Sequence, residues 1–186
     1  MQKTDRIQVE SNGFTWELRY GTTADVDPTI EQLSDDLDER EREKRRRKLR
    51  LYASESDRDV ILALSEDRII GYLTIVDYDE PRPDISAEIA ERLKNFAFPS
   101  QLQVHPDFRK RGVGSSLMLQ AERWARKRGK PGLWSITHRK AYWYKRDFGY
   151  KELGKVWEKE TYKTVIVKEF EGTVIKQSLD PPTGRK

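Results

Sequence analysis

The first part of the chain alternates apolar and polar positions with a period of two. Every second residue from Phe14 to Tyr20 is aromatic or leucine, a spacing that predicts a strand with one buried face. A helix is expected next, with Asp27 as its N-cap and Pro28 in its first position. Apolar residues keep helical spacing as far as Leu37, but the eleven positions from Asp38 to Lys48 are all charged. No apolar stripe passes through them, so this stretch of the charged helical segment 28–53 is expected to be solvated or mobile.

Two β-branched, apolar runs follow and predict the centre of a sheet. Val60–Leu64 and Ile69–Val76 are separated by the four polar residues 65–68, which suits a hairpin. Segment 77–95 is then rich in Asp, Glu and Pro, and its end regains a short helical period. We interpret this segment as an insertion over the sheet.

The second half of the chain continues the alternation of strands and helices. Strands are expected at 96–104, 133–137 and 161–170, and helices at 112–128, where Gly129 is the expected C-cap, and at 141–148. This pattern predicts an α/β (α+β) fold. A length of 186 residues fits one domain, for which we expect residues 1–176, followed by a flexible C-terminal tail at 177–186.

Composition narrows the class of protein. Charged residues make up 37% of the chain and hydrophobic ones 35%, which argues against a membrane protein, while 5 Trp and 8 Tyr favour a folded core. The absence of Cys excludes disulfides, thiol nucleophiles and Cys-based zinc sites, and with only two His we expect no metal. The first twenty residues contain no apolar run of signal-peptide length, so we expect a cytoplasmic protein.

The segment that carries chemistry joins the strand ending at Val104 to the helix 112–128. Gly112 and Gly114 would let the backbone approach a ligand closely, and the first helical turn offers free N–H groups. The three consecutive cations 109–111 add positive charge beside those groups. A diphosphate is the expected ligand. The Walker A pattern is absent, and the Rossmann fingerprint is incomplete because Leu117 stands where its third Gly would fall.

This segment resembles the acyl-CoA-binding motif of the GNAT superfamily of N-acyltransferases, [Q/R]-x-x-G-x-[G/A] after a strand ending in V-x-P. Arg109, Gly112 and Gly114 match the motif. Residues 68–73 look like the third strand of the family, and 141–150 resemble its final motif. The resemblance covers roughly residues 59 to 152.

The resemblance implies a mixed, mostly antiparallel sheet of about six to seven strands, splayed between the fourth and fifth strands near 98–104 and 133–137. It also implies acetyl-CoA as acyl donor and an amine acceptor. We expect no membrane partner and no metal, nucleic acid is the less favoured partner, and a homodimer is left open. The strand would contact pantetheine and the loop would bind the diphosphate. The residues implied are Leu102, Gln103, Val104, Arg109, Lys110, Arg111, Gly112, Val113, Gly114 and Ser115.

The catalytic residues implied by the resemblance are less defined. The family's usual acid is a Tyr four residues before Gly149, where this chain has Lys145. Tyr144 and Tyr142 are therefore the candidate acids, with packing as the alternative role for each. His138, just after the strand 133–137, is a candidate base, while His105 is expected at the surface. No Asp or Glu lies in 96–104, so a water relay or an acceptor that arrives as the free amine could replace a base.

The charged run permits two interpretations. Its basic second half could bind nucleic acid. Alternatively, acids in its first half and bases in its second complement a helix dipole, with pairs Glu41–Arg45 and Glu43–Arg47 one turn apart. In the arrangement that the resemblance implies, this segment borders the acceptor cleft as a mobile, charged wall. We favour the second interpretation, and with it an N-acetyltransferase that acts by direct attack in a ternary complex. A non-catalytic acyl-CoA-binding or nucleic-acid-associated protein on the same fold is the alternative.

Overall fold

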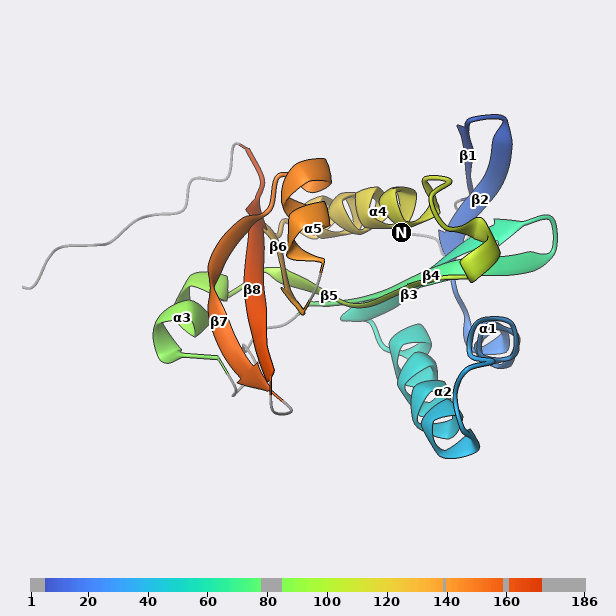
Figure 1. Cartoon of the computed structure of the whole chain (residues 1–186), viewed down its shortest axis with the longest axis horizontal. Helices are drawn as coiled ribbons and strands as arrows, with labels where there is room; N and C mark the ends of the chain where they lie inside the picture. Colours follow the sequence, from blue (N-terminus) through green and yellow to red (C-terminus); the bar gives the residue numbers. More distant parts are fainter. Residues whose placement is uncertain (1–5, 78–84, 139, 159–160, 172–186) are drawn as a thin grey trace, which may run out of the picture.

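The described strands form one sheet. A computed structural model describes residues 6–77, 85–138, 140–158 and 161–171, and within them eight strands pair in the order β1-β2-β3-β4-β5-β6-β8-β7 (Figure 1). Neighbours are antiparallel except for the parallel pair β5 and β6. The strands are β1 (Ile7–Ser11), β2 (Phe14–Tyr20), β3 (Arg58–Ser65), β4 (Arg68–Asp77), β5 (Ala97–Val104), β6 (Gly132–Thr137), β7 (Lys151–Glu158) and β8 (Thr161–Glu169).

The predicted fold class is confirmed, but the sheet has eight strands instead of six to seven. β1 and β7, the two edge strands of the described sheet, were not predicted from the sequence. Edge strands bury little, and the polar β7 sequence KELGKVWE shows no apolar alternation. The predicted hairpin is present as β3 and β4, with a tighter turn because Arg68 already pairs with Ser65.

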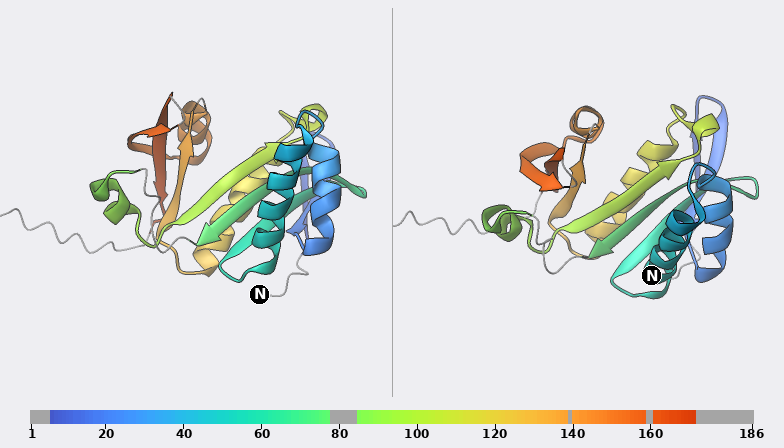
Figure 2. Two further views of the ribbon diagram at one scale, coloured as in Figure 1. Left: turned by 90° about the horizontal axis from the view of Figure 1, so that it is seen from below. Right: turned by 60° about the horizontal axis from the view of Figure 1, so that its bottom comes forward.

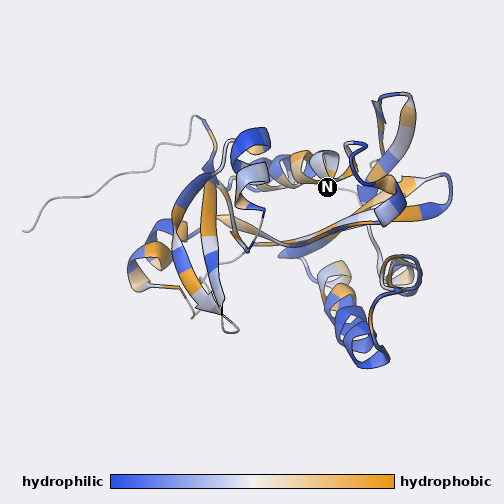
Figure 3. Ribbon diagram, in the orientation of Figure 1, coloured by the Kyte–Doolittle hydropathy of each residue, from blue (hydrophilic) through white to orange (hydrophobic). Residues whose placement is uncertain are grey.

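Helices cover both faces of the sheet (Figures 1 and 2). α4 (Val113–Lys127) and α5 (Ala141–Phe148) lie on one face, over a core that includes Trp16, Leu117 and Trp124. α1 (Val26–Leu33) and α2 (Glu39–Ser54) lie on the opposite face, over a second core that includes Trp134. Figure 3 shows the apolar central strands between these layers and the largely hydrophilic surface of α2.

The charged segment differs from its prediction at its start and in being divided. It forms two helices, since α1 begins at Val26 with Asp25 instead of Asp27 as N-cap, and α2 begins after a break with Asp38 as N-cap. The Asp38 carboxylate accepts the backbone N–H of Glu41 at 2.8 Å, which is the favourable start of a helix rich in acids. α2 is packed as well as solvated, because its last turns bury Leu49, Tyr52 and Ala53.

The two predicted charge pairs on α2 have different outcomes. Arg47 lies 4.0 Å from Glu43, as expected. The predicted Glu41–Arg45 pair is wrong: Glu41 lies 3.9 Å from Lys44, and Arg45 turns toward the sheet.

The expected insertion contains a short helix, α3 (Ala87–Leu93), which begins at the N-cap Ser86. Residues 78–84 of that segment and the tail 177–186 lie outside the described residues. None of the described helices combines the length and apolar character needed to span a membrane.

Candidate active site

The two parallel strands of the sheet separate from each other along their length. β5 pairs with β6 at one position, where Ala97 lies beside Leu133, and both residues are fully buried. By contrast, β5 pairs with β4 along most of the length of β5. Figure 2 (left) shows that β5 and the golden β6 lie close together at one end and diverge toward the other. The family resemblance implied this splay between the strands near 98–104 and 133–137, where the structure has it.

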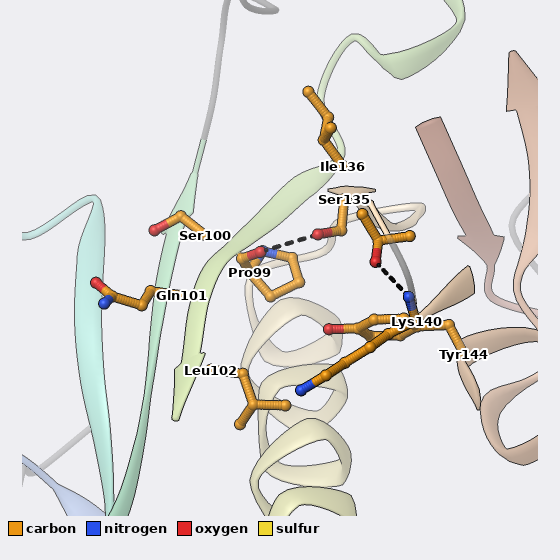
Figure 4. A pocket seen from close by; sticks show the side chains of 9 residues that line it. Pro99, Ser100, Gln101, Leu102, Ser135, Ile136, Lys140 and Tyr144 are labelled. Atoms are coloured by element: carbon orange, nitrogen blue, oxygen red, sulfur yellow. Dashed lines mark hydrogen bonds between the residues drawn. The ribbon is translucent and has the colours of Figure 1, made fainter. Parts of the chain in front are cut away.

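A cavity of about 140 Å³ occupies the divergence, as Figure 4 shows. Residues from β5, β6 and the start of α5 line it. They are Pro99, Ser100, Gln101, Leu102, Ser135, Ile136, Thr137, Lys140 and Tyr144.

The β5 wall of the cavity carries an irregularity. Thr74 of β4 pairs with Gln101 and Ile75 pairs with Pro99, so Ser100 is an extra residue in the strand. Such a bulge leaves the backbone of the extra residue outside the ladder, and Pro99 has no N–H to donate. The Ser100 hydroxyl is held on the α2 side, 2.9 Å from Thr74 Oγ1 and 3.1 Å from the Tyr52 hydroxyl. The bulge thus brings unpaired backbone to the cavity wall.

The three predicted pantetheine contacts lie on β5 beyond the bulge. Leu102 and Val104 pack against the core under α4. The Gln103 side chain points to the other face, where it donates to the Leu33 carbonyl and accepts a hydrogen bond from Arg45 at 2.5 Å. Gln103 therefore joins β5 to α1 and α2, a side-chain role that the sequence did not predict.

The predicted phosphate loop leads from β5 into α4. Gly112 is the N-cap of α4 with φ of 91°, a left-handed conformation that favours glycine. The first backbone bond of the helix runs from the Ser116 N–H to the Gly112 carbonyl at 2.9 Å, so the N–H groups of Val113, Gly114 and Ser115 have no helical partner.

Gly114, the other glycine of the loop, is required neither by a left-handed backbone nor by packing. A Cβ at Gly114 would meet Val104 at 3.7 Å and Trp143 at 4.0 Å, which are ordinary contacts. Packing within the chain does not demand glycine at this position. Close approach of a ligand to the helix N-terminus, which would favour glycine here, stays a prediction.

The three cations of the loop are exposed but differently placed. The Arg109 Nε donates to the Val104 carbonyl at 3.1 Å, tying the loop to the end of β5. The Arg111 guanidinium lies 5.1 Å from the Phe14 ring and 5.7 Å from the Phe108 ring, a cation–π arrangement that positions its charge beside the loop. Lys110 adopts a positive φ of 61° at the turn.

The two candidate acids occupy opposite environments. Tyr144 lines the cavity and is 9% exposed, whereas Tyr142 is 72% exposed under the Arg146 guanidinium. Burial raises the pKa of Tyr144 to about 12, so its hydroxyl keeps its proton at neutral pH. Among the described residues, no group hydrogen-bonds with that hydroxyl.

Both histidines lie outside this cavity. His138 is exposed, and its Nε2 lies 3.0 Å from the Thr161 hydroxyl. His105 accepts the Asp107 N–H through Nδ1 at 3.3 Å, and its Nε2 lies 2.7 Å from Arg68, so it shapes the turn after β5. The described residues include no group of three or more Asp, Glu or His side chains that could hold a metal.

Several lining residues were not predicted from the sequence. Lys140 is the most polar of them, and its side chain runs beside the Tyr144 ring toward Leu102 (Figure 4). Its backbone N–H donates to Thr137 Oγ1 at 3.2 Å, which fixes the start of α5 against the end of β6. Pro99 carried the one usable signal, because proline inside a central strand is confined to bulges.

One of the comparisons with known proteins identifies a family. Residues 26–150 match the model of the acetyltransferase (GNAT) family, and a search of curated proteins found no match. The structure is similar to that of the PaiA N-acetyltransferase from Thermoplasma acidophilum in complex with coenzyme A, at 19% identity and a TM-score of 0.59, covering 83% of this chain and 99% of that one.

Two further solved structures show the same fold. The aminoglycoside 6'-N-acetyltransferase AAC(6')-IG from Acinetobacter haemolyticus is 20% identical with a TM-score of 0.60, covering 76% of this chain and 94% of that one. The GNAT domain of PAT from S. lividans is 16% identical with a TM-score of 0.60, covering 89% and 97%.

Proposed function

Because the chain belongs to the GNAT family of acetyltransferases, we propose that it transfers the acetyl group of acetyl-CoA to a primary amine by direct attack in a ternary complex. The observation that carries the proposal is the cavity between β5 and β6, which contains Tyr144. β5 runs from this cavity into the loop at the start of α4, where the N–H groups of residues 113–115 have no helical partner.

The loop binds the cosubstrate in this proposal. The N–H groups of residues 113–115 donate to the diphosphate of CoA, and the charges of Arg109, Lys110 and Arg111 compensate its negative charge. The exposed edge of β5 at Leu102 and Val104 contacts pantetheine. The thioester then lies in the cavity near the bulge at Ser100.

The reaction itself needs two groups of the chain, a backbone N–H of β5 and the Tyr144 hydroxyl. The acceptor nitrogen forms a bond to the thioester carbonyl carbon, and backbone N–H at the bulge of β5 stabilises the oxyanion. When the C–S bond breaks, its electron pair goes to sulfur and the Tyr144 hydroxyl donates a proton to it. The tyrosinate regains a proton from the ammonium that the acceptor nitrogen has become, directly or through water.

The test measures thiol release from acetyl-CoA with a panel of primary amines, together with the mass of the product. We expect one thiol for each acetylated amine. If the protein binds CoA and acetylates no amine of any charge or size, it is a non-catalytic acyl-CoA-binding protein and the proposed function is wrong.

A further inference from the structure

Arg45 differs from the other cations of α2 in its surroundings. It is partly buried, and its Nη1 donates to two neutral groups, Gln103 Oε1 at 2.5 Å and Ser34 Oγ at 3.3 Å. Among the described residues no carboxylate lies within ion-pair distance of it. By contrast, Arg46 lies 2.8 Å from Asp27 and 2.6 Å from Glu43.

The nearest ionisable neighbour does not neutralise Arg45. Burial raises the pKa of Tyr72 to about 12 although Arg45 lowers it, so Tyr72 is a neutral phenol at pH 7. A guanidinium has five N–H donors, and the hydrogen bonds to Gln103 and Ser34 both come from Nη1. A partly buried cation without a counter-ion favours an anion at its remaining donors.

Arg45 lies roughly 10 Å from the bulge at Ser100, by two estimates along the chain. Tyr52 lies seven residues further along α2, about 10 Å by helical rise, and its hydroxyl touches Ser100 at the bulge. Gln103 lies three residues from Ser100 along β5, again about 10 Å by strand rise. Between these points the Lys48 ammonium lies 5.5 Å from the Tyr52 ring. Positive charge therefore follows α2 from Arg45 toward the bulge, on the face opposite α4.

We propose that the amine acceptor carries an anionic group, a carboxylate or a phosphate, that binds Arg45 while the amine reaches the bulge at Ser100. This inference rests on the proposed acetyl transfer at the same site. The spacing of roughly 10 Å exceeds the distance between amine and carboxylate in an α-amino acid, so the anion is several bonds away from the amine. The substrate class is an ω-amino carboxylate or an aminoalkyl phosphate.

The experiment compares kcat/KM across acceptors of matched length: ω-amino carboxylates, their methyl esters, aminoalkyl phosphates and diamines. We expect each anionic acceptor to exceed its neutral ester by roughly 10- to 100-fold, the value of a charge-assisted hydrogen bond. The carboxylate and phosphate series show which anion the site prefers. If esters or diamines react as well as the anionic acceptors while acetyl transfer proceeds, the inference is wrong and the proposed function stands.

Variants of Arg45 distinguish a role in binding the anion of the acceptor from a role in holding α2 on β5. Arg45→Gln is expected to remove most of the preference for anions through KM and to leave kcat/KM for the esters within about 3-fold, while Arg45→Lys keeps a preference. Arg40→Gln is the matched control on the exposed face of the same helix and should change neither series. A loss with Arg45→Gln that is equal for anionic and neutral acceptors would assign Arg45 to holding α2 on β5 and overturn the inference.

Discussion

Tyr144 and Tyr142 are two positions apart on α5 and face opposite ways, the first 9% exposed in the cavity and the second 72% exposed. Consecutive helical residues are rotated by about 100°, so two positions turn a side chain through about 200°. The Trp143 ring lies between them in sequence and meets the Tyr144 ring edge-on at 4.8 Å. The packing of Trp143 and Phe148, 4.9 Å apart, fixes this orientation of the helix.

This difference predicts separate effects for two matched variants. Tyr144→Phe keeps the ring and removes the hydroxyl, and we expect kcat to fall roughly 100-fold with little change in acetyl-CoA affinity. Tyr142→Phe should be nearly silent. Steady-state kinetics with calorimetric CoA affinities tests both. The opposite ranking would make Tyr142 the acid, and full activity of both variants would assign protonation to solvent or to the acceptor.

The raised pKa of Tyr144 has a consequence for the pH profile. An acid works only while protonated, and burial raises the pKa of this hydroxyl to about 12, so it stays competent across the range from pH 6 to 10. We expect kcat/KM to rise as the acceptor amine deprotonates, without a fall below pH 10. The Tyr144→Phe profile should run parallel to that of the parent at a lower level. A falling limb between pH 7 and 9 that only the parent shows would contradict this role.

The titration of the Asp25 carboxyl affects the free energy of unfolding. Burial alone would raise the pKa of the Asp25 carboxyl, but hydrogen bonds from Arg19 and Thr22 outweigh it and lower the pKa to about 2. Because the folded pKa lies below the unfolded value, the stabilisation is full above about pH 4 and is lost as pH falls toward 2. Asp25→Asn should cost about 1–2 kcal/mol at pH 7, and this difference in the free energy of unfolding should shrink by pH 3.

Urea unfolding at pH 7, 5 and 3 measures the effect, and Asp36→Asn on the exposed connection between α1 and α2 is the control. A difference between Asp25→Asn and the parent that is unchanged at pH 3 would mean that the Arg19 contact, 2.6 Å from Asp25, stabilises through its geometry and not its charge.

The strands inside the sheet could be predicted because they bury both faces or alternate clearly. β4 is buried at eight consecutive positions from Ile69 to Val76, so its apolar run is unambiguous. β1 and β7 could not be predicted in this way, since an edge strand needs few apolar residues. The division of the charged segment had a local signal, Asp38 followed three residues later by Glu41, which is typical of a helix start.

Only the part of the candidate site that lies in one continuous segment of the chain could be predicted from the sequence. The loop 109–115 carries its own pattern of glycines and cations. The cavity is assembled from β5, β6 and α5, whose distances from one another depend on packing between the two cores. The same holds for Arg45 and Gln103, which are 58 residues apart and meet only because α2 packs against β3 and β4, beside β5.

The phosphate-loop assignment predicts that Gly114→Glu abolishes CoA binding. Ordinary contacts of 3.7 and 4.0 Å surround a Cβ at this position, so the variant should fold. Its carboxylate would occupy the place of the diphosphate and repel it, and we expect an affinity loss of roughly 100-fold or more. Leu119→Glu adds the same charge at a 49% exposed position of the same helix and serves as the control. Calorimetry on the parent should show binding that weakens with salt. If the folded Gly114→Glu protein binds CoA as tightly as Leu119→Glu, the start of α4 does not hold the diphosphate and the cosubstrate enters the sheet elsewhere.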